Sequence, residues 1–264
     1  MSNSLLIIDP QNDFCSPDGT LYVPGAEDDC SRLASFIDVN SEKIETIHIT
    51  LDCHPNYHIA HPYFWVDNST GKNPAPFTII TYKDFLEKKF SPVDSSLRRQ
   101  VENYLLSLEN RGKYNLTIWP PHCLTATWGF CVENNVWNAV HRWELKHVGK
   151  NIDYIKKAAN PLTEHYSAVQ AEVPDPSDSS TRTNFVLIDK LKEADKIIVA
   201  GEALSHCVAN TLRDLTVYIP AYKISVLVDC TSCVSGFEDE GKHFMEEFQS
   251  KGMQFEKSID FNWN

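Results

Sequence analysis

Residues 197–215 read IIVAGEALSHCVANTLRDL, which combines an apolar run, a glycine and a helical pattern. Residues 197–200 are short, apolar and mostly β-branched, as in a strand that is covered on both faces. Gly201 ends the run, and Val208, Leu212 and Leu215 follow at the spacing of one helix face. The stretch therefore predicts a buried strand, a sharp turn and a helix, with Cys207 in the first helical turn.

Cys207 is the candidate nucleophile of this unit. At a helix start, unpaired backbone N–H groups and the positive end of the helix dipole lower the pKa of a thiol and favour the thiolate. A thiolate attacks electrophilic carbon at neutral pH. The alternative is a small buried hydrophobic residue, the ordinary role of a cysteine inside a protein.

Composition limits the kinds of partner. The 264 residues carry a net charge of -12, which argues against nucleic acid or an anionic membrane as a partner. The chain has no apolar run of transmembrane length. Its eight cysteines are too sparse for a disulfide scaffold, so we expect free thiols. These features predict one large cytoplasmic α/β domain that acts on a small molecule.

Polar residues follow two further apolar runs. Residues 5–8 lead into Asp9, and the alternating run 47–51 leads to Asp52 and His54. Open α/β sheets bind ligands at the carboxyl ends of their strands, although Asp9 would equally cap a turn before Pro10. Because residues two apart on an extended chain point the same way, Asp52 and His54 can share a metal ion if a third ligand joins them.

His122 is the candidate third ligand. It follows a predicted strand at 114–118, so we expect it to arrive from a neighbouring strand end; the alternative is a hydrogen-bonded turn histidine. A strand near 152–155 runs into Lys156 and Lys157, a pair that alone is typical of a solvated surface. The C-x-x-C at 230–233 has no second pair with which to bind zinc.

The remaining pattern alternates helices and strands. Helices are predicted near 97–108, 132–143, 185–191 and 237–251, and strands near 77–82, 224–228 and 253–257. This alternation predicts an α/β fold with a Rossmann-like doubly wound sheet, mostly parallel, with helices on both faces.

Several motifs carry a family resemblance. They are DPQNDF at 9–14, GTL at 19–21, VPGA at 23–26, DCHP at 52–55, WPPHC at 119–123, YSA at 166–168 and GEALSHCV at 201–208. In this order they resemble the nicotinamidases of the isochorismatase-like cysteine hydrolase superfamily. The resemblance implies a single isochorismatase-like hydrolase domain over 1–264, with an insertion at about 59–113. It also implies hydrolysis of nicotinamide to nicotinate and ammonia through a cysteine thioester, a step of pyridine nucleotide salvage in NAD metabolism.

The resemblance also implies roles for single residues. Cys207 matches the nucleophile and Asp9 the acid/base. Lys157 matches the third catalytic residue because it lies nine residues before Tyr166, with Lys156 as the alternative. The backbone N–H groups of Ala203 and Cys207 match the oxyanion hole, beside a cis peptide at 202–203.

The implied ligand contacts lie beside these residues. Asp52, His54 and His122 match ligands of one divalent metal ion that holds the pyridine nitrogen, with zinc favoured over iron or manganese. Phe14 and Trp119 match aromatic residues that contact the substrate ring. The substrate would be nicotinamide or a similar amide, and a homo-oligomer is compatible with the sequence.

Glu202 departs from the family pattern, which usually has a small apolar residue there. A carboxylate at this turn opposes thiolate formation unless it points away or is paired. One alternative is a related cysteine amidase that acts on a carbamoyl or ureido compound. Another is a non-catalytic thiol sensor or ligand-binding protein, suggested by Glu202, Cys230 and Cys233.

Overall fold

A six-stranded parallel sheet forms the centre of the molecule. The computed structural model describes residues 2–112 and 114–263. The sheet contains β1 (Asn3–Ile8), β2 (Thr46–Asp52), β7 (Asp153–Lys157), β8 (Lys196–Gly201), β9 (Ile224–Leu227) and β10 (Gln254–Glu256) in the order β10-β9-β8-β1-β2-β7. All neighbouring strands are parallel. Because the order reverses between β1 and β8, the crevice for a ligand is expected at the carboxyl ends of these two strands.

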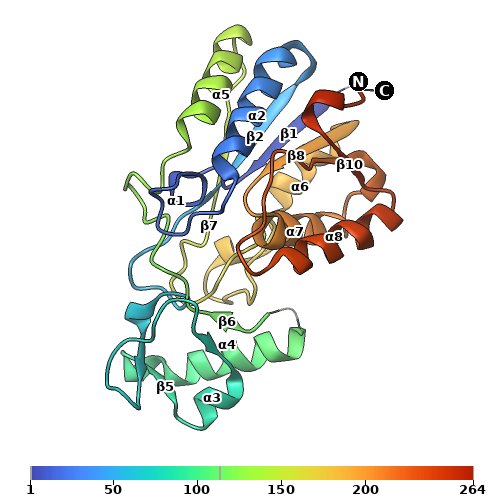
Figure 1. Ribbon diagram of the computed structural model, residues 1–264. Coiled ribbons are helices and arrows are strands. Elements are labelled where there is room, and N and C mark those ends of the chain that lie inside the picture. Colours follow the sequence, from blue (N-terminus) through green and yellow to red (C-terminus); the bar gives the residue numbers. More distant parts are fainter. Residues whose placement is uncertain (1, 113, 264) are drawn as a thin grey trace.

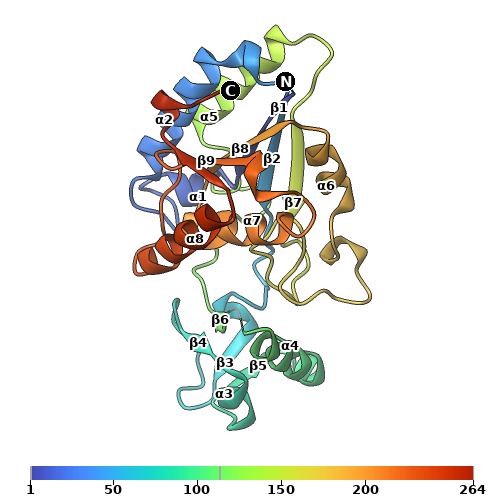
Figure 2. The same ribbon diagram turned by 90° about the vertical axis from the view of Figure 1, so that its right-hand side faces the viewer.

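Helices cover both faces of the sheet, as predicted. On one side lie α2 (Ala26–Val39) and α5 (Asn134–Lys146), and on the other lie α6 (Phe185–Lys192), α7 (Ala209–Leu215) and α8 (Glu238–Ser250) (Figures 1 and 2). Every residue of β1 is buried, which explains its uninterrupted apolar run. The short helix α1 (Asn12–Cys15) follows β1. Single turns of 3-10 helix occupy Ser41–Lys43, Pro62–Phe64, Ser95–Leu97, Ser179–Thr181, Ala221–Lys223 and Ser258–Asp260.

Residues 62–117 form a small lobe beyond the carboxyl ends of the sheet (Figures 1 and 2). It contains two antiparallel pairs, β3 (Trp65–Asp67) with β5 (Phe90–Pro92) and β4 (Ile79–Ile80) with β6 (Leu116–Thr117), and the helices α3 (Tyr82–Leu86) and α4 (Arg98–Arg111). The lobe overlaps most of the predicted insertion at about 59–113 and extends beyond it to β6, and the division into one domain with an insertion stays a prediction.

The lobe corrects one expectation about His122. The strand predicted at 114–118 is only Leu116–Thr117, and it pairs with β4 of the lobe instead of joining the main sheet. His122 therefore does not arrive from a neighbouring strand end of the sheet; it lies in the loop after β6. The strand predicted at 77–82 is likewise short, because the capping box of Thr81 and Asp84 starts α3 there.

The described residues fit two further expectations from composition. All eight cysteines are free thiols. Within residues 2–112 and 114–263, no helix combines the length and apolar character needed to cross a membrane.

Candidate active site and histidine cluster

The nucleophile turn follows β8. Gly201 has a φ of +106°, and a Cβ there would lie 2.1 Å from the carbonyl oxygen of Ile8, so only glycine lets β8 approach β1 at this point. A cis peptide joins Glu202 and Ala203, and one turn of π-helix, Leu204–Val208, leads into α7. Cys207 lies in this π-helical turn and is buried. The predicted strand, turn and helix are therefore present.

Asp9, Lys157 and Cys207 converge at the carboxyl edge of the sheet. The Lys157 Nζ lies 3.0 Å from Asp9 Oδ2 and 3.6 Å from Cys207 Sγ. Thr50 Oγ1 donates a hydrogen bond to Asp9 Oδ1 over 2.6 Å and holds that carboxyl in place. Lys156, the alternative lysine, is exposed. The structure thus brings the three predicted residues together and favours Lys157 over its neighbour.

Burial controls the charges of this group. Burial lowers the pKa of Lys157, but Asp52 and Asp9 outweigh that effect and hold the pKa well above its usual value, so the amine is a cation. Burial raises the pKa of Asp9, with Lys157 acting against it. Burial also raises the pKa of Cys207 well above its usual value. Burial therefore opposes the thiolate that the helix start was expected to favour, while the Lys157 cation supports it.

Asp52, His54 and His122 also lie together. The Asp52 Oδ2 is 3.1 Å from His54 Nε2 and 3.5 Å from His122 Nε2, while Asp52 Oδ1 is 3.0 Å from Lys157 Nζ. Burial raises the pKa of Asp52, but His54 and Lys157 outweigh it and hold the pKa well below its usual value. The carboxylate is therefore anionic and lies between the lysine and the two histidines.

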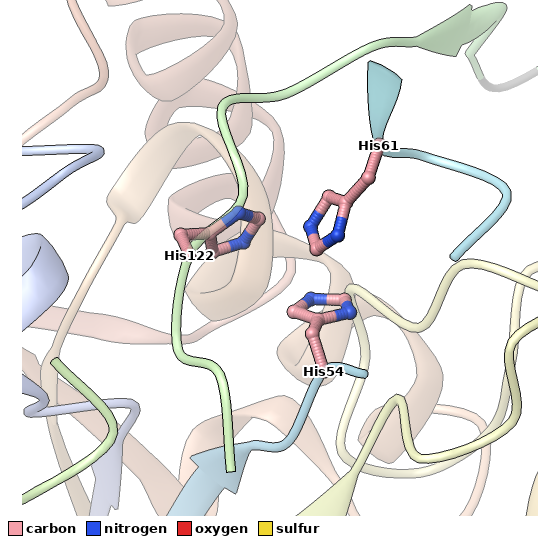
Figure 3. Close-up of side chains that lie close together, drawn as sticks. All are labelled: His54, His61 and His122. Atoms are coloured by element: carbon pink, nitrogen blue, oxygen red, sulfur yellow. The ribbon is translucent and has the colours of Figure 1, made fainter. Parts of the chain in front are cut away.

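His61 joins this cluster and was not predicted. One ring nitrogen each of His54, His61 and His122 lies within 4.8 Å of the others, and Figure 3 shows the three imidazoles pointing toward one another. The spacing of His54, His58 and His61 in the sequence was the available signal. His58 is not available to the cluster, because both of its ring nitrogens have backbone partners: Nε2 contacts the Thr163 carbonyl and Nδ1 accepts a hydrogen bond from the Ala60 N–H.

The cluster has the donor set of a transition-metal site. Within the described chain, neither ring nitrogen of His61 has a hydrogen-bond partner. Burial lowers the pKa of His61 to about 2, so its imidazole is neutral and offers a free lone pair. Neutral imidazoles beside a carboxylate suit zinc, iron or another divalent transition metal. The residues present therefore fit a divalent cation.

An aromatic pocket lies against both groups. It is narrow, with a cavity volume of about 30 Å³, and its walls include Phe14, Trp119, His122, Ala203 and Cys207. Both aromatic residues predicted to contact a ring thus line the pocket that contains the thiol.

Two further pocket residues were not predicted. Tyr166 accepts a hydrogen bond of 3.0 Å from Trp119 Nε1, which fixes the indole ring. Glu164 also lines the pocket. Tyr166 belongs to the YSA motif, which gave it no role in the pocket, and Glu164 carried no sequence signal because it lies in the irregular segment after β7. The pocket thus brings aromatic side chains, the Cys207 thiol and His122 of the histidine cluster to one small cavity.

The fold is that of the solved nicotinamidase and pyrazinamidase structures on which the chain superposes, in agreement with the resemblance that the motifs carry. More particularly, the chain is similar to nicotinamidases. The nicotinamidase of Saccharomyces cerevisiae is 26% identical to it over 237 residues, which is 88% of each chain. No protein-family model matches the sequence.

Solved structures show the same fold. The yeast nicotinamidase bound to the inhibitor nicotinaldehyde superposes with a TM-score of 0.67 at 21% identity, over 97% of this chain and 99% of the other. The pyrazinamidase of Pyrococcus horikoshii in complex with zinc gives a TM-score of 0.58 at 19% identity, over 97% and 99%. The predicted fold and the resemblance to nicotinamidases are confirmed.

Proposed function

We propose that this protein is an amidohydrolase that converts nicotinamide and water to nicotinate and ammonia. The observation that carries the proposal is the contact of one buried lysine with both Asp9 and Cys207 on the edge of an aromatic pocket. The 26% identity to a nicotinamidase over most of both chains supports it. Nicotinate formation would place the protein in pyridine nucleotide salvage.

The first half-reaction uses the acid/base and the nucleophile. Asp9, within hydrogen-bonding reach of Cys207, takes the thiol proton as the sulfur attacks the amide carbon. The N–H groups of Ala203 and Cys207 are the proposed donors to the oxyanion, a contribution of about 3 to 4 kcal/mol for each donor. Asp9 then gives its proton to the leaving amine, so that ammonia departs and a thioester remains.

The second half-reaction reverses these roles. Asp9 removes a proton from water as the water oxygen attacks the thioester carbon, the carbon–sulfur bond breaks to release nicotinate, and Asp9 passes its proton to the sulfur to restore the thiol. Lys157 remains a cation throughout and stabilises the carboxylate form of Asp9. The lysine therefore adjusts the basicity of Asp9 and transfers no proton itself.

The pocket orients the substrate. Phe14 and Trp119 would contact the two sides of the pyridine ring and exclude water. Asp52, His54, His61 and His122 would hold one divalent cation, zinc by preference, which supplies a Lewis acid for the ring nitrogen. Because such an ion would bind a ring nitrogen directly, substrates with a suitably placed heteroaromatic nitrogen should react best.

Ammonia release by the purified protein tests this function. Nicotinamide should yield equimolar ammonia and nicotinate, and Cys207→Ala should yield neither. Cys131→Ala is the matched control because that cysteine is exposed and does not line the pocket. Ammonia from an N-carbamoyl amino acid but not from nicotinamide would show the related amidase instead. Equal behaviour of Cys207→Ala and the wild type would favour the thiol sensor.

Metal analysis is the companion measurement. Protein purified without added ions should contain about one divalent ion per chain, and elemental analysis identifies it. A chain without bound metal that still hydrolyses nicotinamide would contradict the role given to the histidine cluster. Homo-oligomer formation and the cytoplasmic location stay predictions.

A further inference from the structure

Glu202 is buried behind the nucleophile turn and does not face the thiol. Its Oε2 accepts a hydrogen bond of 3.0 Å from the Ser232 N–H. The charged groups that act on Cys207 are Lys157, Asp9 and Asp52. The departure from the family pattern therefore places a carboxyl in the protein interior, hydrogen-bonded to Ser232 and outside the lining of the pocket.

Glu202 belongs to a network that joins three segments. Ser232 Oγ donates to Asp29 Oδ2 of α2, and Arg32 of α2 donates to the other Asp29 oxygen over 2.6 Å. The Leu204 N–H donates to the Ser232 carbonyl over 2.8 Å. The turn, the loop after β9 and helix α2 are thereby connected through Glu202, Ser232 and Asp29.

The surroundings of Glu202 favour a neutral acid. Asp29 and Cys30 lie beside it on α2, Cys15 lies beside it on α1, and its Oε1 has no hydrogen-bond partner in the described part of the chain. Both oxygens of Asp29 already accept hydrogen bonds from Arg32 and Ser232. Burial, followed by the charge of Asp29, raises the pKa of Glu202 well above its usual value. An ionised Glu202 would place two buried carboxylates side by side.

We propose that Glu202 carries a proton at neutral pH and acts as a positioning residue that fixes the Glu202-Ala203 turn to α2 through Ser232 and Asp29. The neutral acid accepts the Ser232 N–H with one oxygen and directs its own O–H toward Asp29. The turn provides the Ala203 N–H, so its position determines how well the oxyanion is bound. This inference rests on the proposed function only where activity is its readout.

The first test measures the proton without using activity. A carboxyl whose pKa is raised on folding contributes stability below its unfolded pKa, and that stability is lost as the pH rises through the folded pKa. Glu202→Gln mimics the protonated acid and cannot ionise. From pH 5 to 7, the unfolding equilibrium constant of the wild type, divided by that of Glu202→Gln, should rise by about tenfold per pH unit.

Two variants of α2 sharpen this test. Asp29→Asn removes the neighbouring charge and lowers the folded pKa of Glu202, so in that background the ratio should stop rising at a lower pH than in the wild type. Asp28→Asn, an exposed carboxylate on the same helix, is the matched control and should leave the rise as in the wild type. A ratio that does not change with pH would show that Glu202 holds no extra proton and would overturn the proposal.

The second test measures the position of the turn. Glu202→Ala should lower kcat for nicotinamide at least tenfold and change KM less than threefold, since the oxyanion forms only in the transition state. Glu202→Gln should restore kcat to within about threefold of wild type. Equal losses in the Gln and Ala variants, or no loss in either, would refute the positioning role.

Failure of the proposed function gives a different pattern. A wild type without amidase activity would refute nicotinamide hydrolysis, and the unfolding ratio would still report the proton on Glu202. The rate of Cys207 alkylation by iodoacetamide, followed on its peptide by mass spectrometry, would then replace kcat. The alkylation rate in Glu202→Ala should differ from that of the wild type, and the rate in Glu202→Gln should equal that of the wild type. Equal rates in all three proteins would refute the positioning role.

Discussion

Replacing Lys157 by Met removes a buried ammonium and keeps a side chain of similar length. Lys157 is only 2% exposed, and its Nζ lies 3.0 Å from an oxygen of Asp9 and 3.0 Å from one of Asp52. At an effective dielectric constant of about 20, Coulomb's law gives about 5 kcal/mol for one such pair, much of which the cost of burying the charges cancels. Removing one partner of a buried pair nevertheless costs about 3 to 5 kcal/mol, because the other charge is left unpaired.

We therefore expect Lys157→Met to lower the free energy of unfolding by about 3 to 5 kcal/mol at pH 7. The loss should be smaller at pH 5. In the wild type the pKa of Asp52 is held low, so the stability it contributes is present at neutral pH and is lost as the pH falls. Without the ammonium, the folded-state pKa values of Asp9 and Asp52 rise, so the variant gains stability relative to wild type on acidification.

Urea unfolding followed by circular dichroism at pH 7 and pH 5 measures both quantities. Lys156→Met is the matched control, because Lys156 is exposed on the same strand and should change the free energy by less than about 0.5 kcal/mol. A loss below about 1 kcal/mol for Lys157→Met, or an equal loss at the two pH values, would refute the reasoning about the buried ion pairs.

Three further changes test other parts of the structure. Gly201→Ala should destabilise the fold by about 2 to 3 kcal/mol, measured by urea unfolding, since its Cβ would lie 2.1 Å from a carbonyl oxygen of β1; wild-type stability would contradict this. His61→Asn should weaken zinc binding at least about tenfold in competition with a chelator, whereas exposed His243→Asn should not; equal affinities would exclude His61 as a ligand. Phe77→Ala removes an edge-to-face contact with Trp119 and should lower kcat/KM about two- to tenfold, and an unchanged value would show that the lobe does not support the pocket.

The fold was predictable because its buried parallel strands require unbroken apolar runs. Residues 5–8 and 197–200 have no polar member, and they are the adjacent central strands β1 and β8. The lobe was harder to predict, since its strands are two or three residues long and pair only with one another. A pair such as β4 and β6 lies far apart in the sequence, so a local pattern cannot show which sheet each joins.

The site residues that lie at the end of a strand were predictable from the sequence. Asp9, Asp52 and Lys157 all lie at the carboxyl ends of central-sheet strands. Because these ends meet at one edge of a parallel sheet, the sequence alone indicates that the three side chains lie close together. His61 lies in an irregular segment, and only the folded chain brings it to His122. The effect of burial on the pKa of Cys207 was also beyond the sequence, because the residues that bury the thiol come from several elements.

The histidine cluster lies where the lobe joins the central sheet. His61 directly precedes it and His122 lies a few residues after it, while His54 follows the central strand β2. A cation shared by the three would therefore fasten both the entry and the exit of the lobe to the body of the protein. Stripping the ion should loosen the two crossing points at once, so protease cleavage near residues 56–60 and 118–124 would report metal occupancy directly.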